Sequence, residues 1–153
     1  MERRVSLIVR RLKVMDIPAL EALEREAVER HPGRVGWLDT YRRFVERSLA
    51  EEPEGFLVAE LNEKVIGGTI ARLRGPHPLT GQKHGQLLAL TASPAYARYN
   101  VGQRLLVEAQ AYLKSRGCKS VTVWVPTDAQ GGEVELFKTA GFNVVSWELE
   151  RAL

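Results

Sequence analysis

The sequence predicts an α/β fold in which a mixed central β-sheet is flanked by helices. Short apolar segments rich in β-branched residues alternate with segments whose apolar residues recur at helical spacing. Their order is one strand, two helices, three strands, then helix, strand, helix and strand, which is typical of a sheet covered by helices. The 153 residues, 44% hydrophobic and 27% charged, suffice for one core, and no repeat or long linker divides them. We therefore expect a single domain over residues 1–153.

The first half of the chain is expected to form a strand, two helices and a hairpin. Their predicted bounds are residues 5–9, 16–30, 39–52, 56–61 and 64–73. Asp16 is placed to cap the first helix, and Pro53 ends the second because proline cannot continue a helix. The two residues between the hairpin strands, Asn62 and Glu63, match a tight turn. The pair Gly67-Gly68 inside the second hairpin strand indicates a bulge or a close approach of another backbone.

The second half is expected to alternate strands and helices after a loop at residues 75–81. The predicted strands and helices cover residues 85–92, 101–116, 119–125, a short helix up to 140, and 143–149. Pro94 closes the first of these strands, and Gly117 and Gly141 fit the left-handed position that ends a helix. The last strand is an edge to which a second copy of the chain could pair.

The composition argues against several classes of protein. The net charge of +3, from 22 basic and 19 acidic residues, is scattered, so no nucleic-acid partner is expected. The apolar run near the N-terminus is too short for a signal peptide or a membrane span, so no membrane partner is expected. Cys118 is the only cysteine, which excludes an intrachain disulfide and favours a cytoplasmic location. His31, His77 and His84 lack metal-ligand spacing, so no metal is predicted.

The junction between the predicted strand at 85–92 and the helix at 101–116 is a candidate anion site. A strand stopped by Pro94 leads through a polar loop into an amphipathic helix. The first turn of such a helix has unpaired N–H groups and the positive end of the helix dipole, which suit phosphate oxygens. Asn100 and Gly102 can adopt conformations that let the backbone curl around an anion. A plain strand-loop-helix connection has the same pattern, so the residues alone leave both interpretations open.

A family pattern favours the phosphate interpretation. The GNAT superfamily of N-acetyltransferases binds pyrophosphate through the segment Pro-x-Tyr-(Arg/Gln)-x-x-Gly-x-(Gly/Ala)-x-x-Leu-Leu. The residues that fall in register with it are Pro94, Tyr96, Gly102, Leu105 and Leu106. Residues 136–142 (LFKTAGF) resemble a second family motif, Leu-Tyr-x-x-x-Gly-Phe, and the order of elements resembles the family fold over nearly the whole chain. His84-Gly85 is similar to the N-terminal-amine acetyltransferases of this family.

The resemblance implies acetyl-CoA as co-substrate and a cofactor slot in the sheet. The pantetheine would pair with backbone groups near Leu90 and Ala92, and the pyrophosphate would bind N–H groups from Arg98 to Gln103. The cofactor-binding positions implied in this way are Leu90, Thr91, Ala92, Ala97, Arg98, Tyr99, Asn100, Val101, Gly102, Gln103, Gln130 and Phe137. Arg104, in the first helical turn, either reaches a phosphate or is a solvated surface residue.

Three positions depart from the family pattern. Ala97 replaces arginine or glutamine, and Asn100 replaces a glycine, a mild change because asparagine visits the left-handed region more readily than most residues. Phe137 stands where the family commonly has the tyrosine proposed as general acid. The leaving thiolate has a parent thiol of pKa about 8.5 and departs with little help, so slowed or differently assisted turnover is expected. Tyr99 is the candidate replacement hydroxyl, since Tyr96 matches a structural position of the family.

No motif marks the general base. Glu60, at the end of a central predicted strand, is the catalytic candidate, with a solvated hairpin carboxylate as the alternative and deprotonation through water as a third route. Trp37 and Tyr41 either line an acceptor pocket or pack under the second helix.

The expected function is acetyl transfer from acetyl-CoA to a primary amine by direct attack. A protein N-terminus, a polyamine or amino acid, and an antibiotic-like amine remain open as acceptors. The contrasting hypothesis is a non-catalytic acyl-CoA-binding or regulatory module, which would keep the phosphate loop without the catalytic residues. The expected partners are the amine acceptor and, through the edge strand at 143–149, a second copy of the chain.

Overall fold

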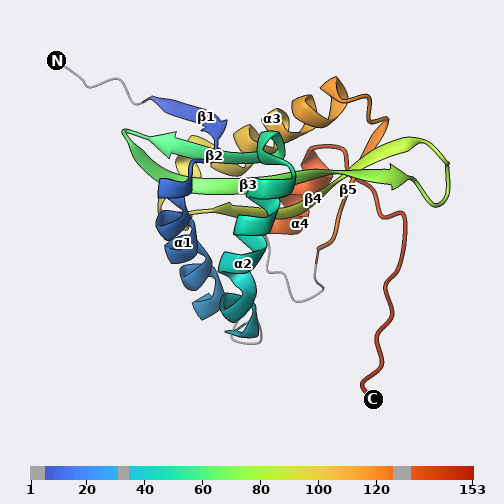
Figure 1. Cartoon of the computed structure of the whole chain (residues 1–153), viewed down its shortest axis with the longest axis horizontal. Helices are drawn as coiled ribbons and strands as arrows, with labels where there is room; N and C mark the ends of the chain where they lie inside the picture. Colours follow the sequence, from blue (N-terminus) through green and yellow to red (C-terminus); the bar gives the residue numbers. More distant parts are fainter. Residues whose placement is uncertain (1–5, 31–34, 126–131) are drawn as a thin grey trace.

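One five-stranded sheet organises the protein, whose computed structural model describes residues 6–30, 35–125 and 132–153 (Figure 1). The strand order is β1-β2-β3-β4-β5. The strands are β1 (Leu7–Arg11), β2 (Phe56–Leu61), β3 (Lys64–Pro76), β4 (Lys83–Ala92) and β5 (Ser120–Val123). Neighbours from β1 to β4 are antiparallel, whereas β4 and β5 are parallel. The predicted mixed sheet is therefore confirmed.

Helices cover both faces of this sheet. They are α1 (Ile17–Arg30), α2 (Val35–Glu51), α3 (Val101–Ser115) and α4 (Gly132–Thr139). α1 and α2 lie together below the sheet in Figure 1, and α3 crosses above it. α2 starts at Val35 rather than near Asp39, because Trp37 joins its packed face by contacting the Tyr41 ring, with 5.6 Å between centroids. None of the helices described here is long and apolar enough to cross a membrane.

Each face of the sheet has its own apolar core. On the α3 side, Leu105 packs against strand residues that include Ala59. On the α1–α2 side, Leu20 and Val45 pack with Val58. Successive residues of a strand point to opposite faces, so β2 feeds both cores from adjacent positions. Full burial of a leucine such as Leu105 contributes about 1.5–3 kcal/mol to stability.

The glycine pair in β3 lets helices approach both faces of the sheet closely. A Cβ atom added at Gly67 would lie 2.8 Å from Val101 Cγ1, at the start of α3, and 2.9 Å from the Thr91 carbonyl oxygen. A Cβ added at Gly68 would lie 2.8 Å from Leu20 Cδ2 of α1 on the other face. Both expected features occur here, since the Thr91 main chain comes close to Gly67 and the β2–β3 register shifts between Ala59 and Glu60, next to Gly67.

Left-handed residues occur where turns and caps were expected. Asn62 and Glu63 have φ values of 49° and 68° and form the two-residue turn between β2 and β3. Gly117 (φ 88°) follows the end of α3, and Gly141 (φ 93°) follows α4. The hairpin and both glycine caps are confirmed.

The strand predicted at residues 143–149 is wrong. This segment has no ladder partner among the described residues and runs away from the sheet to the C-terminus (Figure 1). Its alternating apolar residues are exposed: Val145 at 61%, Trp147 at 85% and Leu149 at 93%. A strand forms only through hydrogen bonds to a neighbour, and local alternation cannot reveal whether a neighbour is available.

Candidate functional site

The parallel strands β4 and β5 separate partway along β4. Their pairing runs from His84–Ser120 to Leu87–Val123 and then stops. On the β3 side the ladder continues, and Ala92 still pairs with Gly67. Among the described residues, the stretch Leu90–Ala92 therefore has one strand neighbour, and its second edge offers free main-chain N–H and C=O groups.

A bulge in β4 determines which side chains face which core. Ile70 pairs with Ala89 but Ala71 pairs with Leu87, so β4 has one extra residue at Leu88. After the bulge, Leu90 and Ala92 pack into the α3-side core. Thr91 points to the opposite face, where its hydroxyl reaches α1. The end of β4 thus presents its main chain to the gap beside β5 and the Thr91 hydroxyl to the α1–α2 side.

The loop between β4 and α3 ends in an uncapped helix start. A 3₁₀ turn (Pro94–Tyr99) leads to Asn100, whose φ of 54° is left-handed, as expected for the residue that replaces the family glycine. The Asn100 N–H donates to the Ala97 carbonyl at 3.2 Å, so it is already engaged. The first bond of α3 runs from the Arg104 N–H to the Asn100 carbonyl at 3.1 Å, and no side chain caps the helix.

Within the part of the chain that the structure describes, the helix start therefore has a set of free donors. The N–H groups of Val101, Gly102 and Gln103 precede that first intrahelical bond and have no helical acceptor. Val101 is buried at 2% exposure and holds the turn against β3, whereas Gln103 is exposed. A helix start with free N–H groups and the positive dipole end is suited to a phosphate group.

The second family motif lies beside this helix start. A Cβ at Gly102 would come 3.1 Å from Leu136 Cδ2 of α4. Phe137 is 6% exposed and contacts the Phe142 ring edge-on, with centroids 5.3 Å apart. Phe137 therefore belongs to the α3-side core and carries no polar group into the site. Gln130, also predicted to bind cofactor, lies outside the described residues.

The hydroxyl candidates sit on the surface of the 3₁₀ turn. Arg98 stacks over the Tyr99 ring at 4.8 Å, and its guanidinium donates to the Tyr99 hydroxyl at 3.0 Å. Lys64 donates to the Tyr96 hydroxyl at 3.4 Å. Both tyrosine oxygens thus have cationic neighbours, and Arg98 adds positive charge next to the free N–H groups of α3.

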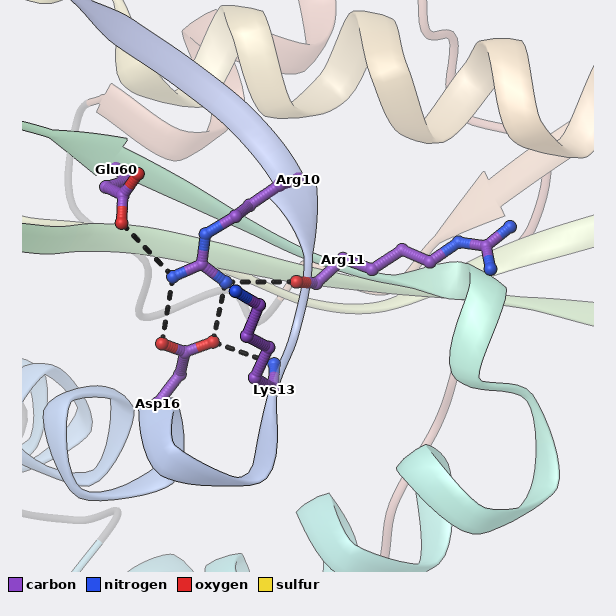
Figure 2. Close-up of polar contacts among 5 residues, drawn as sticks. All are labelled: Arg10, Arg11, Lys13, Asp16 and Glu60. Atoms are coloured by element: carbon purple, nitrogen blue, oxygen red, sulfur yellow. Dashed lines mark hydrogen bonds and ion pairs between the residues drawn. The ribbon is translucent and has the colours of Figure 1, made fainter. Parts of the chain in front are cut away.

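Glu60 lies in an ion-pair cluster near the start of α1 (Figure 2). Arg10 holds Asp16 through two hydrogen bonds of 2.7 and 2.9 Å and reaches Glu60 Oε1 at 3.3 Å. The Asp16 carboxylate also accepts the Lys13 N–H at 2.7 Å, so it caps the turn before α1. The hydrogen bonds from Arg10 lower the pKa of Asp16, against the opposing effect of its burial.

This cluster does not bring Glu60 to the end of β4. Glu60 belongs to β2, and β3 lies between β2 and β4. The structure therefore groups Leu90–Ala92 with the start of α3, and places Glu60 apart from them beside Arg10. Glu60 as general base stays a prediction.

A buried carboxylate that the sequence analysis did not single out faces the end of β4. Glu24 of α1 is 8% exposed. It accepts a hydrogen bond from the Thr91 hydroxyl and another from Trp37 Nε1 at 3.2 Å. The signal was present in the sequence, because Glu24 lies four residues after Leu20 and four before Val28, inside the apolar stripe of α1.

Aromatic residues of α2 close this side of the site. Trp37 contacts the Tyr41 and Phe44 rings, with 5.6 and 5.0 Å between centroids. Tyr41 is 4% exposed, and burial, followed by the charges of Glu24 and Glu21, raises its pKa far above the ordinary value. The ring contacts and the burial of Tyr41 support packing on α2, Tyr41 also lines a small pocket with Glu24 and Thr91, and an acceptor pocket at Trp37 and Tyr41 stays a prediction. No group of three metal-ligating side chains occurs among the residues the structure describes.

Comparison with known proteins agrees with these features. The model of the acetyltransferase (GNAT) family matches residues 19–142. An uncharacterized N-acetyltransferase of Methanocaldococcus jannaschii is 24% identical over 107 residues, which are 70% of this chain and 46% of that protein. The match thus spans about half the length of this relative.

Solved structures have the same fold at low sequence identity. Aminoglycoside N-acetyltransferase AAC(6')-Iy in complex with CoA gives a TM-score of 0.77 at 14% identity, over 100% of this chain and 98% of that one. A transcriptional regulator from Bacillus halodurans C-125 also gives 0.77, at 16% identity, over 97% of this chain and 100% of that one. The family model covers most of the sequence, and the expectation of an acyltransferase holds at the level of the family. From the motif at 93–106, the parted strands and these matches together, the chain belongs to the acetyltransferase (GNAT) family.

Proposed function

We propose that this protein transfers an acetyl group from acetyl-CoA to a primary amine. The observation that carries the proposal is the place where β4 leaves β5 after Leu87, beside the uncapped start of α3. Val101 Cγ1 of α3 and the Thr91 carbonyl oxygen of β4 lie 2.8 and 2.9 Å from one point, the Cβ position of Gly67, so the start of α3 packs close to the end of β4. A ligand that combines a peptide-like arm with a pyrophosphate matches both sets. CoA, which AAC(6')-Iy binds on the same fold, is such a ligand.

The cofactor would use main-chain groups for most of its contacts. Its pantetheine would run along Leu90–Ala92, and its pyrophosphate would accept the N–H groups of Val101, Gly102 and Gln103. Arg98 and the exposed Arg104 supply positive charge at the rim. Two further contacts with CoA remain predictions, one from Gln130 and one from the apolar side chain of Phe137.

The reaction would proceed by direct attack. The amine nitrogen bonds to the thioester carbon, the oxygen takes up negative charge near a main-chain N–H of β4, and the C–S bond then breaks. The CoA thiolate leaves and takes the second proton of the amine. Because Phe137 offers no hydroxyl, departure relies on the weak basicity of the thiolate or on Tyr99.

A valine at position 102 is expected to weaken CoA binding tenfold or more, about 1.4 kcal/mol. Its Cβ would come within 3.1 Å of Leu136, and the branched side chain would crowd the phosphate position. Isothermal titration of CoA into the Gly102→Val protein measures the effect. The matched control is Gly75→Val, because an added Cβ at Gly75 meets nothing within 4 Å. Equal CoA affinity in a folded Gly102→Val variant would refute this placement of the cofactor.

The acceptor is a primary amine of one of three classes. These are a protein N-terminus, a polyamine or amino acid, and an aminoglycoside-like amine. Thiol release from acetyl-CoA, measured across one representative of each class, tests the function directly. Transfer to any of them supports the proposal, and binding of CoA without transfer to any amine contradicts it.

A non-catalytic CoA-binding module is the alternative function. Two observations favour it: Phe137 is a core residue where the family has a tyrosine, and the predicted base Glu60 is held by Arg10. One of the structures with the same fold is named a transcriptional regulator. Tight CoA binding with no transfer is the result expected of such a module. We expect no salt-dependent nucleic-acid binding from either function.

We also propose that a second copy of the chain covers the C-terminal segment and that the protein is cytoplasmic. The exposed Trp147 and Leu149 lie on an unpaired extended segment, and β5 is an edge strand of the sheet. Within the described residues β5 pairs with β4 alone, and the extended segment of a second copy would add a strand at its other edge. Cys118 is partly buried, and burial raises the pKa of its thiol, which suits a reduced, unreactive cysteine.

Light scattering after size exclusion is expected to give the mass of a dimer. Trp147→Ser combined with Leu149→Ser should yield a monomer, because the apolar contacts are lost. Leu79→Ser is the matched control and should stay dimeric, because Leu79 lies in a loop and its side chain is also exposed, at 76%. A wild-type monomer at tens of micromolar would show that no second copy covers the segment.

A further inference from the structure

Thr91 belongs to two surfaces at once. Its main chain lies on the part of β4 that has no β5 neighbour among the described residues, where the proposed function places the cofactor. Its hydroxyl lies on the α1–α2 face of the sheet and donates a hydrogen bond to Glu24 Oε1. The Glu24 carboxylate is therefore one hydrogen bond away from the strand that would hold the thioester.

Glu24 carries a buried carboxyl group in a largely apolar environment. Its residue is 8% exposed, and the nearby pocket between α1, α2 and the β3–β4 ladder includes Leu20, Phe56 and Ile70. The two groups that hold it, the Thr91 hydroxyl and the Trp37 indole, are neutral donors. Within residues 6–30, 35–125 and 132–153, Glu24 forms no ion pair. A carboxylate removed from water in this way favours a cation at its side.

The other ionisable groups on this side are occupied or neutral. Glu21 of α1 pairs with Arg42 of α2 at 2.7 Å. Tyr41 of α2 keeps its proton, since burial raises the pKa of its phenol. From the sheet, β3 and β4 contribute Thr69 and Thr91, whose hydroxyl groups stay neutral. Glu24 is thus the proton acceptor in the described part of this pocket.

We propose that the Glu24 carboxylate binds the ammonium group of the acceptor and takes its proton, so that Glu24, rather than Glu60, is the catalytic base. The inference rests on the proposed acetyl transfer. The geometry that carries it is the juxtaposition of a buried carboxylate on α1 with the Thr91 position of β4. Thr91 and Trp37 are positioning residues, because each fixes one carboxylate oxygen.

The proton and electron pairs balance in this scheme. The acceptor enters as R–NH₃⁺ and loses one proton to Glu24, which becomes a neutral carboxylic acid. The freed nitrogen lone pair forms the new C–N bond, and the C–S bond breaks with its electrons going to sulfur. The thiolate then takes the second proton from nitrogen, giving the amide and free CoA. Glu24 returns its proton to solvent before the next turnover.

The test compares Glu24→Gln with wild type, using acetyl-CoA with spermidine, kanamycin or a peptide with a free N-terminal alanine. We expect kcat/KM for the best of these amines to fall about 100-fold or more, as for loss of a positioned base. The calorimetric Kd for CoA should stay within about twofold, well short of the tenfold change that about 1.4 kcal/mol would give. The reason is that Glu24 lies on the α1 side of the sheet, whereas the proposed CoA contacts are main-chain groups. Glu26→Gln, on the exposed face of the same helix, is the matched control and should keep wild-type transfer.

A second substrate separates a chemical role from a structural one. Hydroxylamine is uncharged at neutral pH and needs no base to free its lone pair, so the Glu24→Gln variant should retain transfer to it. Equal loss with hydroxylamine and with the charged amines would overturn the inference and assign Glu24 to packing alone. Unchanged transfer to the charged amines would also overturn it, while leaving the proposed function intact.

Failure of the proposed function gives a different result. In that case wild type itself transfers acetyl to no amine although it binds CoA, and the role of Glu24 falls with it. If circular dichroism shows that Glu24→Gln is unfolded, Glu24→Asp is the second variant. Aspartate keeps the charge but withdraws it by one methylene, so a partial loss for charged amines and none for hydroxylamine is expected. Full activity of Glu24→Asp with spermidine and hydroxylamine alike would contradict the inference.

Discussion

Replacing Gly67 with alanine is expected to lower the free energy of unfolding by about 3 kcal/mol and the melting temperature by roughly 6–12 °C. The new Cβ would lie 2.8 Å from Val101 Cγ1, 2.9 Å from the Thr91 carbonyl oxygen and 3.1 Å from Leu105 Cδ1. The Thr91 oxygen is part of the main chain and cannot turn aside, so β4 must shift, and the contacts with Val101 and Leu105 push α3 away from the sheet. Since the start of α3 is also the expected phosphate site, CoA affinity should fall as well. Urea unfolding and calorimetry measure the two effects.

Gly36→Ala is the matched control for this substitution. Gly36 lies in α2, and nothing is found within 4 Å of an added Cβ. Alanine is favoured over glycine inside a helix by about 1 kcal/mol, so the control should be neutral or slightly more stable. Similar stabilities for Gly67→Ala and Gly36→Ala would show that the close approach of α3 to β3 is absent in solution.

Replacing Asp16 with asparagine is expected to cost about 2–4 kcal/mol of folding stability. The change removes one acceptor from the paired hydrogen bonds of 2.7 and 2.9 Å to Arg10 and leaves the guanidinium without its closest anion. Charge-assisted hydrogen bonds contribute about 1.5–3 kcal/mol each, and breaking a buried pair costs more than a surface one. Chemical denaturation at neutral pH checks the magnitude.

The effect of Asp16 should depend on pH in a defined direction. Its pKa is lowered in the folded protein, chiefly by the hydrogen bonds from Arg10. The folded state therefore binds fewer protons than the unfolded state, and the stabilisation is complete above the unfolded pKa of about 3.9. It is lost as the pH falls from there through the folded pKa, so wild type and Asp16→Asn should converge in acid.

Glu60→Gln provides the control within the same cluster. The Glu60 side chain has one polar contact with the other described residues, at 3.3 Å to Arg10, so its loss should cost less than about 1 kcal/mol. A difference between wild type and Asp16→Asn that persists unchanged in acid would show that the carboxylate charge of Asp16 is not the source of its contribution.

The elements that the sequence predicts well are those with a local physical cause. β2 falls at Phe56–Leu61 as expected, because β-branched and apolar residues are bounded there by a proline turn and by Asn62-Glu63. The helix over residues 101–115 follows from its apolar spacing and from Gly117. The C-terminal segment has an equally suitable alternation and forms no strand, because pairing depends on a neighbour far away in the sequence.

The candidate site divides in the same way. The free N–H groups at the start of α3 could be expected from the motif at 93–106, since a helix start is a local feature. Glu60 appeared available because its partner, Arg10, lies 50 positions away on another strand. Glu24 lies at a helical spacing that otherwise holds apolar residues, and this pattern predicts a core position without indicating a polar partner. Only the packing of α1 against β4 brings its carboxylate to Thr91.

The free edge of β4 and the open start of α3 also bear on how such a protein can diverge. The groups they offer are N–H and C=O of the main chain, which every residue except proline carries and which substitution of side chains leaves in place. The opposite face depends on individual side chains, among them Glu24, Trp37 and Thr91. Over evolutionary time, one side of the sheet can therefore keep its ligand through wide sequence drift, while the other side can acquire new acceptors by few replacements.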